Sequence, residues 1–438
     1  MLNLLNIESI IGSMSMAEIK ELLKDFNPWW KQEFELVYKE RELFAQLQKF
    51  LPLPQMIALT GLRRVGKTTL MFKIVEDAIK GGVEPTNIVY FSFDEFTVAI
   101  RTIMKVYEEL LEKNLRKGKY ILLLDEVQKV DDWENQLKTV YDTFGQHVKI
   151  VISGSESLFI KRKSKETLAG RMFEFRVQTL SFKEFLSFKG AEFKPVDIYT
   201  RELAKLFNEF TFTLGLPELV GITEKDIIKK YVREGLVEKI VYRDIPTLFR
   251  IKDITVMESL LNIFTEEPGQ LVDISTLAKQ LGISRQTLAM YLDYLEKAFL
   301  LRKLYNFSKN QRKVERKLKK FYPTLISVDL LFREDNLSKS KVFEWLLVNQ
   351  LQAEFFWRDP YKNEVDVVIP NKIPKPVEIK YGKIDTTGLS AFMRKFNINE
   401  GYVISSSLQE KRKIDGKNIF ITPAFKFLLE FNKKANAK

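Results

Sequence analysis

The chain contains no cysteine and a single histidine, His147, among its 438 residues. Without thiols it can form no disulfide and no zinc site built on thiolates. One imidazole also excludes clusters of histidine ligands and argues strongly against a catalytic triad that uses histidine as its base. Any chemistry therefore depends on carboxylates, lysine, arginine, hydroxyl groups and bound metal.

Long apolar runs are also missing, because no stretch approaches the roughly 18 residues that a membrane-spanning helix needs. The first residues lack the basic start and the long apolar core of a secretion signal, so we expect a cytoplasmic protein with no membrane partner. The net charge of +12 favours an anionic partner, with nucleic acid in first place. Charge that merely keeps the protein in solution is the alternative explanation.

The segment from Gly61 to Thr68 matches the phosphate-binding pattern G-x-x-x-x-G-K-[ST] at every defined position. It lies between an apolar run at 56–59 and an amphipathic stretch, which is the strand–loop–helix context that the pattern needs. Backbone N–H groups of such a loop bind β- and γ-phosphates, the lysine adds a charge, and the threonine hydroxyl ligates Mg²⁺. The predicted nucleotide-binding residues are Gly61, Leu62, Arg63, Arg64, Val65, Gly66, Lys67, Thr68 and Thr69.

A second motif follows, in which the apolar run 120–124 ends in two adjacent carboxylates, Asp125 and Glu126. Such a run is typical of a buried parallel strand, and ligands bind at the carboxyl ends of these strands. We predict that Asp125 holds Mg²⁺ with Thr68 and that Glu126 polarises the attacking water. Ser153 and Ser155, after the apolar run 148–152, are candidate sensors of the γ-phosphate. A plain Ser-Gly turn explains that spacing equally well.

The alternation of strand and helix patterns predicts an α/β fold for residues 51–180, with strands near 56–60, 87–93, 120–125, 148–153 and 173–177. Residues 1–50 are expected to be a helical segment, and its stretch from Phe34 to Phe50 to pack on this core. Residues 181–252 show mainly helical patterns, as expected of a lid. There the Gly215-x-Pro217 corner would allow close approach to a ligand.

Residues 253–308 show a helix, a Gly-containing turn and a second helix, followed by a strand, which is the pattern of a winged helix-turn-helix. Arg285, Gln286 and Thr287 would lie at its reading end. Such modules bind either DNA or protein, and both uses stay open. The basic stretch that follows either neutralises phosphates or forms a solvated loop. It comprises Lys309, Arg312, Lys313, Arg316, Lys317, Lys319 and Lys320, and we take Arg312, Lys313, Arg316 and Lys317 as candidate DNA contacts.

Residues 309–438 hold a third set of chemical groups. Glu344 lies on a predicted helix, Asp366 precedes an apolar strand, and Glu378 and Lys380 project from one face of the next strand. Three carboxylates and a lysine of this kind bind Mg²⁺ for phosphodiester hydrolysis, and D-x(n)-E-x-K resembles the arrangement of restriction-endonuclease-like folds. A scaffold of this type that has lost its activity is an equal alternative.

In their order, these motifs resemble a family of prokaryotic AAA-type ATPases joined to a C-terminal domain of undefined role. Besides the motifs above, the resemblance rests on the segments 168–171, 180–185 and 242–245. It implies a RecA-like P-loop core, a helical lid, a winged helix and a restriction-endonuclease-like C-terminal domain. It also implies that Gly215 and Pro217 touch the nucleotide, and that Arg171 acts on the γ-phosphate, either within one chain or across a subunit boundary.

The sequence thus predicts a Mg²⁺-dependent protein that binds and hydrolyses ATP, releases ADP, and acts on or with DNA. Assembly into a homo-oligomer is compatible with this hypothesis. Two alternatives stay open. In one, ATP controls binding to a protein partner, and in the other the C-terminal carboxylates make the protein an ATP-dependent nuclease.

Overall fold

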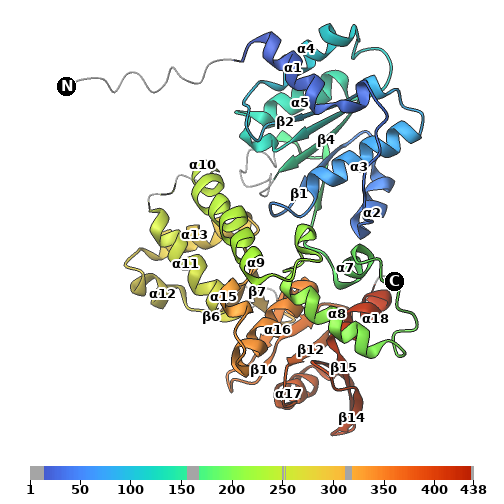
Figure 1. Cartoon of the computed structure of the whole chain (residues 1–438). Helices are drawn as coiled ribbons and strands as arrows, with labels where there is room; N and C mark the ends of the chain where they lie inside the picture. Colours follow the sequence, from blue (N-terminus) through green and yellow to red (C-terminus); the bar gives the residue numbers. More distant parts are fainter. Residues whose placement is uncertain (1–13, 155–166, 249–250, 252, 311–317, 436–438) are drawn as a thin grey trace, which may run out of the picture. The chain divides into compact units, whose positions relative to one another are not determined.

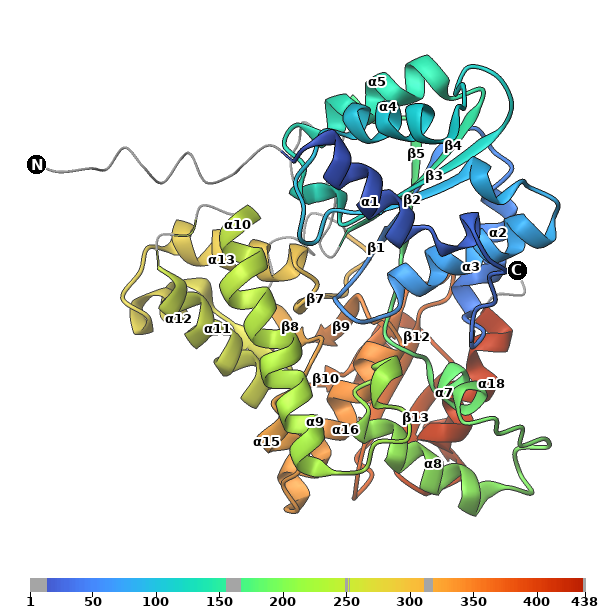
Figure 2. The ribbon, with the colours of Figure 1, turned by 45° about the horizontal axis from the view of Figure 1, so that its top comes forward.

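The computed structural model describes residues 14–154, 167–248, 251, 253–310 and 318–435. Its contacts divide the chain into two compact units, Met1–Gln178 and Thr179–Lys438, and each is described by itself. Figures 1 and 2 show the elements of both units with their labels. Both units combine helices with β-sheet, so the chain is an α/β protein as expected.

The first unit is built on a five-stranded parallel sheet with the order β2-β3-β4-β1-β5. All five predicted strands are confirmed within one or two residues. The strands are β1 (Met56–Thr60), β2 (Ile88–Ser92), β3 (Tyr120–Asp125), β4 (Val148–Gly154) and β5 (Met172–Arg176). The helices are α1 (Met16–Phe26), α2 (Glu42–Phe50), α3 (Lys67–Lys80), α4 (Ile100–Leu111) and α5 (Trp133–Phe144). Because β4 separates β1 from β3, the two predicted motifs lie at strand ends on either side of β4.

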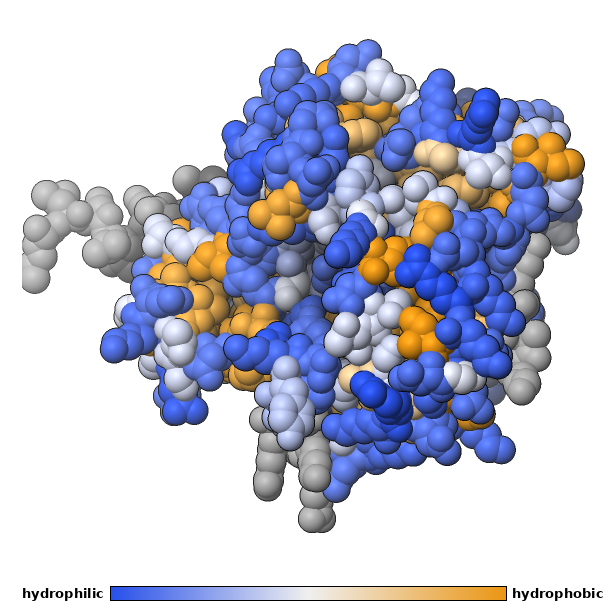
Figure 3. Space-filling view, turned by 90° about the horizontal axis from the view of Figure 1, so that it is seen from below, coloured by the Kyte–Doolittle hydropathy of each residue, from blue (hydrophilic) through white to orange (hydrophobic). Residues whose placement is uncertain are grey.

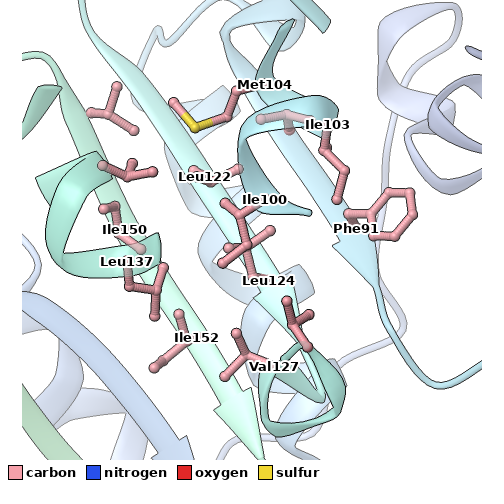
Figure 4. Packing of buried hydrophobic residues seen from close by; sticks show 14 of the residues in the cluster. Phe91, Ile100, Ile103, Met104, Leu122, Leu124, Val127, Leu137, Ile150 and Ile152 are labelled. Atoms are coloured by element: carbon pink, nitrogen blue, oxygen red, sulfur yellow. The ribbon is translucent and has the colours of Figure 1, made fainter. Parts of the chain in front are cut away.

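The main hydrophobic core lies on one face of this sheet, beneath α1, α4 and α5. Figure 4 shows side chains of α4 and α5, among them Ile103 and Leu137, facing Leu122 and Ile150 of the strands. The α3 helix packs on the other face, where Phe72 contacts Tyr90 with ring centroids 4.9 Å apart. Helices therefore cover both faces, which explains why the strands are nearly continuous apolar runs.

Side chains of the N-terminal segment cover the exposed edge of β2. The Asn27 side chain donates to the Tyr90 carbonyl and accepts from the Tyr90 N–H, at 2.9 and 2.7 Å. The indole N–H groups of Trp29 and Trp30 both donate to the Ile88 carbonyl. An uncovered edge strand is open to pairing with other chains, and these contacts occupy its backbone groups.

The expected helix from Phe34 to Phe50 is only half present, because α2 begins at Glu42 and residues 33–41 form no helix. The Leu36 N–H donates to Glu76 of α3 at 3.2 Å, and the Lys73 ammonium lies 5.3 Å from the Tyr38 ring centroid. An extended segment makes these successive contacts along α3. Phe34, Leu36 and Tyr38 alternate with the two-residue period of a strand, and this pattern indicated an extended segment rather than a helix.

The second unit begins with helices, which agrees with the few strand signals in residues 181–252. These helices are α7 (Phe182–Phe188), α8 (Thr200–Phe212), α9 (Lys225–Val232) and α10 (Ile245–Leu248), with short turns such as η4 (Pro217–Leu219) and two π-helical stretches, Arg233–Val237 and Ile240–Asp244. Ser181 and Glu184 form a reciprocal capping box at the start of α7, which satisfies two N–H groups of that helix end.

Three helices and three strands follow, and their strands belong to a sheet with the order β10-β9-β7-β8-β6. The helices are α11 (Ile254–Glu266), α12 (Ile274–Gln280) and α13 (Arg285–Lys297), and the strands are β6 (Gln270–Val272), β7 (Leu301–Asn306) and β8 (Lys319–Pro323). The β7 strand pairs with β8 on one side and with β9 on the other. One sheet therefore joins residues on both sides of the boundary that we placed at 308/309.

The remainder of the unit holds a further five-stranded sheet with the order β11-β12-β13-β15-β14. Its strands are β11 (Val367–Ile369), β12 (Lys375–Lys380), β13 (Glu400–Ser405), β14 (Glu410–Ile414) and β15 (Lys417–Pro423). The other elements are α15 (Val328–Leu331), α16 (Asn336–Gln350), β9 (Phe355–Arg358), β10 (Glu364–Val365), α17 (Thr387–Phe396) and α18 (Ala424–Ala435). The β11 and β12 strands are antiparallel; Asp366 immediately precedes β11, and Glu378 lies in β12.

The surface of the protein is mostly hydrophilic on the face that Figure 3 shows, with hydrophobic side chains in separate patches. Among the described residues, none of the helices combines the length and apolar composition that crossing a bilayer requires.

Candidate functional site

The loop between β1 and α3 has a backbone that only glycine fits at its first position. Gly61 has φ +152°, and a Cβ there would lie 2.3 Å from the Val177 carbonyl oxygen. Gly66 has φ +96° immediately before α3 begins at Lys67. Both residues therefore adopt conformations that side chains disfavour, and the loop leads directly into a helix N-terminus, where backbone N–H groups are free to bind anions. The loop geometry thus fits a phosphate group.

The other residues of the loop divide into buried and accessible positions. Leu62 and Val65 are buried, whereas Arg63 and Arg64 are partly exposed and Thr69 is exposed. An Arg63 guanidinium nitrogen lies 3.6 Å from a carboxylate oxygen of Asp94, which follows β2. The apolar members anchor the loop, and its charged members remain at the surface of the site.

Lys67 is buried, and its ammonium faces the loop and the acidic end of β3. Its Nζ donates to the carbonyl oxygens of Gly61 and Leu62 at 3.2 and 3.1 Å, and it lies 3.7 Å from Oε1 of Glu126. A buried ammonium close to a carboxylate is stabilised by it, because the low local dielectric strengthens their attraction. The cation and the carboxylate predicted to act on a γ-phosphate thus face one another.

Asp125 connects three strands and the start of α3. Its Oδ2 accepts from the Thr68 hydroxyl at 2.7 Å and from the Tyr90 hydroxyl at 2.9 Å, and its Oδ1 accepts from Ser153. Burial and the charge of Asp125 raise the pKa of Tyr90 above its usual range, so Tyr90 remains a donor. A hydroxyl and a carboxylate in contact provide the hard oxygen ligands that Mg²⁺ prefers. Thr68 and Asp125 therefore fit the metal role expected of them.

Glu126 has a left-handed backbone with φ 54°, which turns its side chain back towards the site after the strand has ended. Its N–H donates to the Ser153 hydroxyl at 3.2 Å, and its Oε2 accepts from Gln128 at 2.6 Å. Ser153 therefore contacts both acids, from β4 between the two motifs. Ser155 lies outside the described residues. Tyr90 and Gln128 are site residues that the sequence reasoning missed.

Arg41 is a further residue that the sequence analysis did not identify. It is 5% exposed, and its Nη1 and Nη2 donate to the carbonyl oxygens of Val65 and Gln178, both at 2.7 Å. One guanidinium thus holds the phosphate-binding loop to the last residue of the first unit. The only sequence signal was an arginine just before α2, which does not distinguish it from a surface charge.

Arg171 lies at the wrong end of the sheet for a contact with phosphate in its own chain. It immediately precedes β5, whose Met172 pairs with Met56, whereas the loop follows the pair of Thr60 and Arg176 at the other end. A strand of this length spans about 16 Å. Arg171 instead forms an ion pair with Asp142 at 3.0 Å. Arg171 therefore lies away from the loop of its own chain in this structure, and its action on a γ-phosphate, within one chain or across a subunit boundary, stays a prediction.

The Gly215 corner packs against the start of its own unit. Gly215 has φ +70°, and a Cβ there would lie 2.9 Å from Cβ of Thr179. The Leu180 N–H donates to the Gly215 carbonyl at 2.7 Å, and Pro217 begins the short turn η4. Glycine is thus required here for packing, and contact of Gly215 and Pro217 with nucleotide stays a prediction.

The predicted reading end of α13 is at the surface. Arg285 and Gln286 are exposed, and Thr287 is half-buried because its N–H and its hydroxyl both contact the Ser284 hydroxyl that caps the helix. Arg285 and Gln286 are therefore available to a partner in the described part of the unit, whereas Thr287 serves the cap. Four further candidate DNA contacts lie outside the described residues: Arg312, Lys313, Arg316 and Lys317.

The C-terminal carboxylates meet at the junction of the two sheets of the second unit. Asp366 and Glu378 are both buried, and Asp366 accepts from the Ile379 N–H at 2.7 Å. Burial and the charge of Glu344 raise the pKa of Asp366 to about 6. Burial and the charge of Asp366 raise the pKa of Glu378 well above its usual range. The structure thus brings Glu344, Asp366, Glu378 and Lys380 together, with Lys380 Nζ 2.7 Å from Oε1 of Glu378.

The cluster also contains a buried cation, Lys320, whose position the sequence analysis did not predict. We expected Lys320 to belong to a basic surface stretch, but it is 5% exposed and forms an ion pair with Glu364, with Glu344 at 3.8 Å. Tyr322, two residues further along β8, donates to Glu344 at 2.6 Å. Residues two apart on a strand share a face, so Lys320 and Tyr322 both point into the cluster.

A metal ion would find few carboxylates free in this cluster. In the described ranges, no group of three or more aspartate, glutamate or histidine side chains is arranged to hold a metal ion by itself. Glu378 Oε2, however, is buried and has no hydrogen-bond partner among the described residues. One carboxylate oxygen therefore remains available there.

The fold and the loop geometry define the first unit as a P-loop nucleotide-binding domain. Comparison with protein families agrees, because residues 53–186 match a family described as an AAA domain. Residues 53–186 are therefore similar to AAA-type domains, in agreement with the P-loop fold of the first unit. Residues 204–324 match a domain of unknown function.

The chain also resembles proteins of bacteria and archaea. A Haemophilus influenzae protein named as uncharacterised is 29% identical over 252 residues, an alignment that covers 56% of this chain and 61% of that protein. An uncharacterised protein of Methanocaldococcus jannaschii is 27% identical over 423 residues, with 86% of this chain and 85% of that protein covered. Among solved structures, Cdc6p from Pyrobaculum aerophilum gives a TM-score of 0.30 at 12% identity, with 73% of this chain and 98% of that chain covered.

Proposed function

We propose that this protein binds and hydrolyses ATP with Mg²⁺ in its first unit. The observation that carries the proposal is the contact of Thr68 with Asp125 at 2.7 Å, beside the pair of Lys67 and Glu126 at 3.7 Å. These residues come from two segments almost 60 positions apart. Parallel strand ends bring together a lysine, a metal-ligating pair and a carboxylate, which is the set of groups that phosphoryl transfer from ATP needs.

Each residue has a defined task in this proposal. Gly61 and the N-terminus of α3 bind the phosphates, and Lys67 adds charge to them. Thr68 and Asp125 would hold Mg²⁺, which supplies charge neutralisation when bound. Glu126 orients the attacking water, and Ser153 fixes both acids in place.

Substitution of Glu126 by glutamine tests hydrolysis separately from binding. Glu126→Gln keeps the shape and the hydrogen bond from Gln128 but removes the charge, so ATP affinity is retained and turnover falls by roughly a hundredfold. Glu95→Gln, at an exposed position three residues beyond the end of β2, is the matched control and keeps the wild-type rate. If Glu126→Gln turns over ATP like the wild type, Glu126 does not have this role.

The partner that we propose for the second unit is DNA, which would bind at the start of α13 of a winged helix. Arg285 and Gln286 are exposed there, and the chain carries a net charge of +12. Arg285→Ala weakens DNA binding and reduces its salt dependence, whereas Lys297→Ala, at the other end of α13, leaves both unchanged. If DNA neither binds at low salt nor alters the ATPase rate, a switch that acts on a protein partner is the better explanation.

Arg171 and subunit contacts form a further part of the proposal. Because Arg171 lies at the opposite end of β5 from the phosphate-binding loop, we propose that it acts on the phosphates of a neighbouring subunit in a homo-oligomer. Arg171→Ala then lowers turnover only at concentrations at which the wild type assembles. Equal rates at all concentrations, with the mass measured in parallel, contradict a role across the boundary.

A second candidate function is metal-dependent hydrolysis of phosphodiester bonds in a restriction-endonuclease-like C-terminal domain. A buried oxygen of Glu378 that has no hydrogen-bond partner within the described ranges favours it, because a bound cation would satisfy that oxygen and oppose the charge of Asp366. DNA cleavage with Mg²⁺ or Mn²⁺ that disappears in Asp366→Ala supports this function. Its absence in the wild type under all metal conditions favours a scaffold without activity.

A further inference from the structure

The peptide unit between Val65 and Gly66 has an orientation that the loop backbone does not determine by itself. Such a unit turns over when the ψ of its first residue and the φ of its second change together. Gly66 has φ +96°, and glycine adopts positive and negative φ about equally readily. Turning this peptide over therefore costs little within the loop, and a contact from outside the loop has to fix the side that its N–H faces.

Arg41 supplies that contact. Its Nη1 donates to the Val65 carbonyl oxygen at 2.7 Å, and a Cβ on Gly66 would lie 3.4 Å from the same nitrogen. The guanidinium thus lies directly against this peptide unit. Because the C=O and the N–H of a trans peptide point in opposite directions, a Val65 carbonyl held towards Arg41 directs the Gly66 N–H away from Arg41.

The guanidinium is itself held in place. Its Nη2 donates to the Gln178 carbonyl oxygen at 2.7 Å. The backbone of Arg41 is fixed as well, since its N–H donates to the Tyr38 hydroxyl at 3.2 Å and its carbonyl accepts from the Phe44 N–H at 2.9 Å. A planar fork bound to two carbonyl oxygens has a defined orientation, which a single ammonium group lacks. Arg41 is therefore a fixed point against which the loop is held.

The segment of Val177 and Gln178 belongs to the same arrangement. The Val177 N–H donates to the Thr60 carbonyl at 2.7 Å, at the end of β1. The Val177 carbonyl oxygen lies so close to Gly61 that a Cβ there would come within 2.3 Å of it. This segment thus contacts the first residue of the loop directly, and through Arg41 it holds the later part of the loop as well.

We propose that Arg41 is a positioning residue for nucleotide binding, which holds the Val65 carbonyl and thereby keeps the Gly66 N–H directed at a phosphate group. The inference rests on the proposed function of the first unit. A hydrogen bond that is equally strong in the ground state and in the transition state raises affinity without raising the rate at saturation. Arg41 therefore controls how tightly the nucleotide binds and leaves the rate of hydrolysis at saturating ATP unchanged.

Calorimetry of ADP binding to the full-length protein tests the proposal. Arg41→Ala releases the peptide unit, and ADP affinity falls about ten- to a hundredfold, which is the value of one hydrogen bond to a charged group. Arg41→Lys keeps the charge but not the fork, and affinity falls about three- to tenfold. In both variants the KM for ATP rises by a similar factor and kcat is unchanged.

Lys149→Ala is the matched control. The Lys149 ammonium also donates to backbone carbonyls, those of Phe50, Leu53 and Gln55, at 3.2, 2.8 and 2.6 Å. These carbonyls lie at and just beyond the last residue of α2, whereas Arg41 immediately precedes that helix. Loss of Lys149 therefore lowers the stability of the same unit and leaves ADP affinity unchanged.

The amide signal of Gly66 reports the orientation of the peptide directly. In nucleotide-free wild-type protein labelled with ¹⁵N-glycine, we expect one sharp Gly66 signal that moves when ADP is added. In Arg41→Ala the signal is broadened or doubled before ADP is added, because the peptide exchanges between two orientations. In Lys149→Ala it is the same as in the wild type.

The outcomes separate this inference from the proposed function. Wild-type affinity in Arg41→Ala, an equal loss of affinity in Lys149→Ala, or a fall in kcat without a rise in KM overturns the inference and leaves ATP binding intact. If Arg41→Ala does not fold, Arg41→Lys decides, and wild-type affinity in that variant overturns the inference. A folded wild type that binds no ADP removes the proposed function itself.

Discussion

The two acidic sites of this protein differ in how their charges are satisfied. In the first unit Asp125 accepts hydrogen bonds from three hydroxyl groups, and Glu126 lies beside Lys67. In the second unit Glu378 retains a buried oxygen without a partner in the described residues, and Asp366 has a raised pKa. The first site is therefore complete as a protein structure before any ligand binds, whereas in the described residues the second leaves a buried carboxylate oxygen without a hydrogen bond.

This difference has a consequence for what each site does with a ligand. A preformed, hydrogen-bonded site binds its ligand with little rearrangement and little change in protonation. A site with excess buried charge gains stability when a proton or a cation arrives. The comparison therefore predicts that backbone geometry controls the first site and that charge controls the second.

The largest expected effect is that of a methyl group at Gly61. Gly61→Ala places a Cβ 2.3 Å from the Val177 carbonyl oxygen at a φ of +152°, so the loop has to move. We expect ATP affinity to fall at least about a hundredfold and the unfolding free energy of the first unit to fall by roughly 2 to 4 kcal/mol.

Gly82→Ala is the matched control for this substitution. Gly82 also has a positive φ, +87°, but a Cβ there meets no atom within 4 Å. The unfolding free energy of the Gly82→Ala variant falls by about 1 kcal/mol, and its affinity for ATP is unchanged. Equal losses of affinity in both variants, measured by calorimetry, would show that backbone strain in general, rather than the cradle, determines binding.

Removal of charge from Asp366 has the next largest expected effect. Because the folded pKa of Asp366 is raised to about 6, its protonated form is favoured in the folded state. The stability that this proton provides is present below about pH 4 and is lost as the pH rises through about 6. The side chain of Asp366→Asn still accepts a hydrogen bond from the Ile379 N–H but carries no charge. The unfolding free energy of this variant at pH 7.5 is therefore about 1 to 3 kcal/mol higher than that of the wild type.

Thermal unfolding at several pH values without metal measures this effect. The advantage of Asp366→Asn shrinks between pH 6 and pH 4, and Mn²⁺ at pH 7.5 stabilises the wild type more than the variant. A variant that is less stable than the wild type at pH 7.5 would mean that the cluster is already balanced, and the contrast between the two sites would be lost.

The smallest expected effect is that of the Tyr90 hydroxyl, which holds Asp125 at 2.9 Å. Tyr90→Phe lets the Asp125 carboxylate rotate, so the Mg²⁺ concentration needed for half-maximal ATPase activity rises about three- to tenfold, equivalent to about 1 kcal/mol. ADP binding without Mg²⁺ is unchanged. Tyr107→Phe is the matched control, because it removes a hydroxyl that donates to the Thr86 carbonyl at 2.6 Å. In this variant the stability of the protein changes, and the Mg²⁺ dependence of the ATPase does not. Identical Mg²⁺ dependence in the two variants would contradict a positioning role for Tyr90.

The sequence predicted which residues of the first site lie together, because each of them belongs to a short local pattern. The loop, the lysine and the two acids belong to short patterns that start or end a strand, and strand ends of one parallel sheet meet at one edge. Tyr90 and Arg41 were not predictable in this way. Tyr90 acts through its register with β3, and Arg41 through contacts that reach 24 and 137 positions along the chain.

The second site was predicted only in part. Asp366 immediately precedes β11, and Glu378 and Lys380 lie on its antiparallel neighbour β12, so their meeting followed from strand geometry. Lys320 was placed on a basic surface, because its neighbours in sequence are basic and nothing local shows that β8 is an interior strand of its sheet. Arg171 lies at the end of β5 that is remote from the loop, which the position of its motif beside the predicted strand did not reveal, and its role stays a prediction.

The central claim is that Lys67 and its loop hold a triphosphate beside Asp125 and Glu126. Calorimetry of ATP and ADP binding with Mg²⁺, on the wild type, Lys67→Ala and Lys80→Ala, tests it most directly. Lys80 is at the far, exposed end of the same helix, so its variant controls for loss of a charge from α3. We predict that the wild type and Lys80→Ala bind with equal affinity and that Lys67→Ala does not bind measurably. A folded wild type that takes up neither nucleotide, or a Lys67→Ala variant that binds like the wild type, contradicts the account.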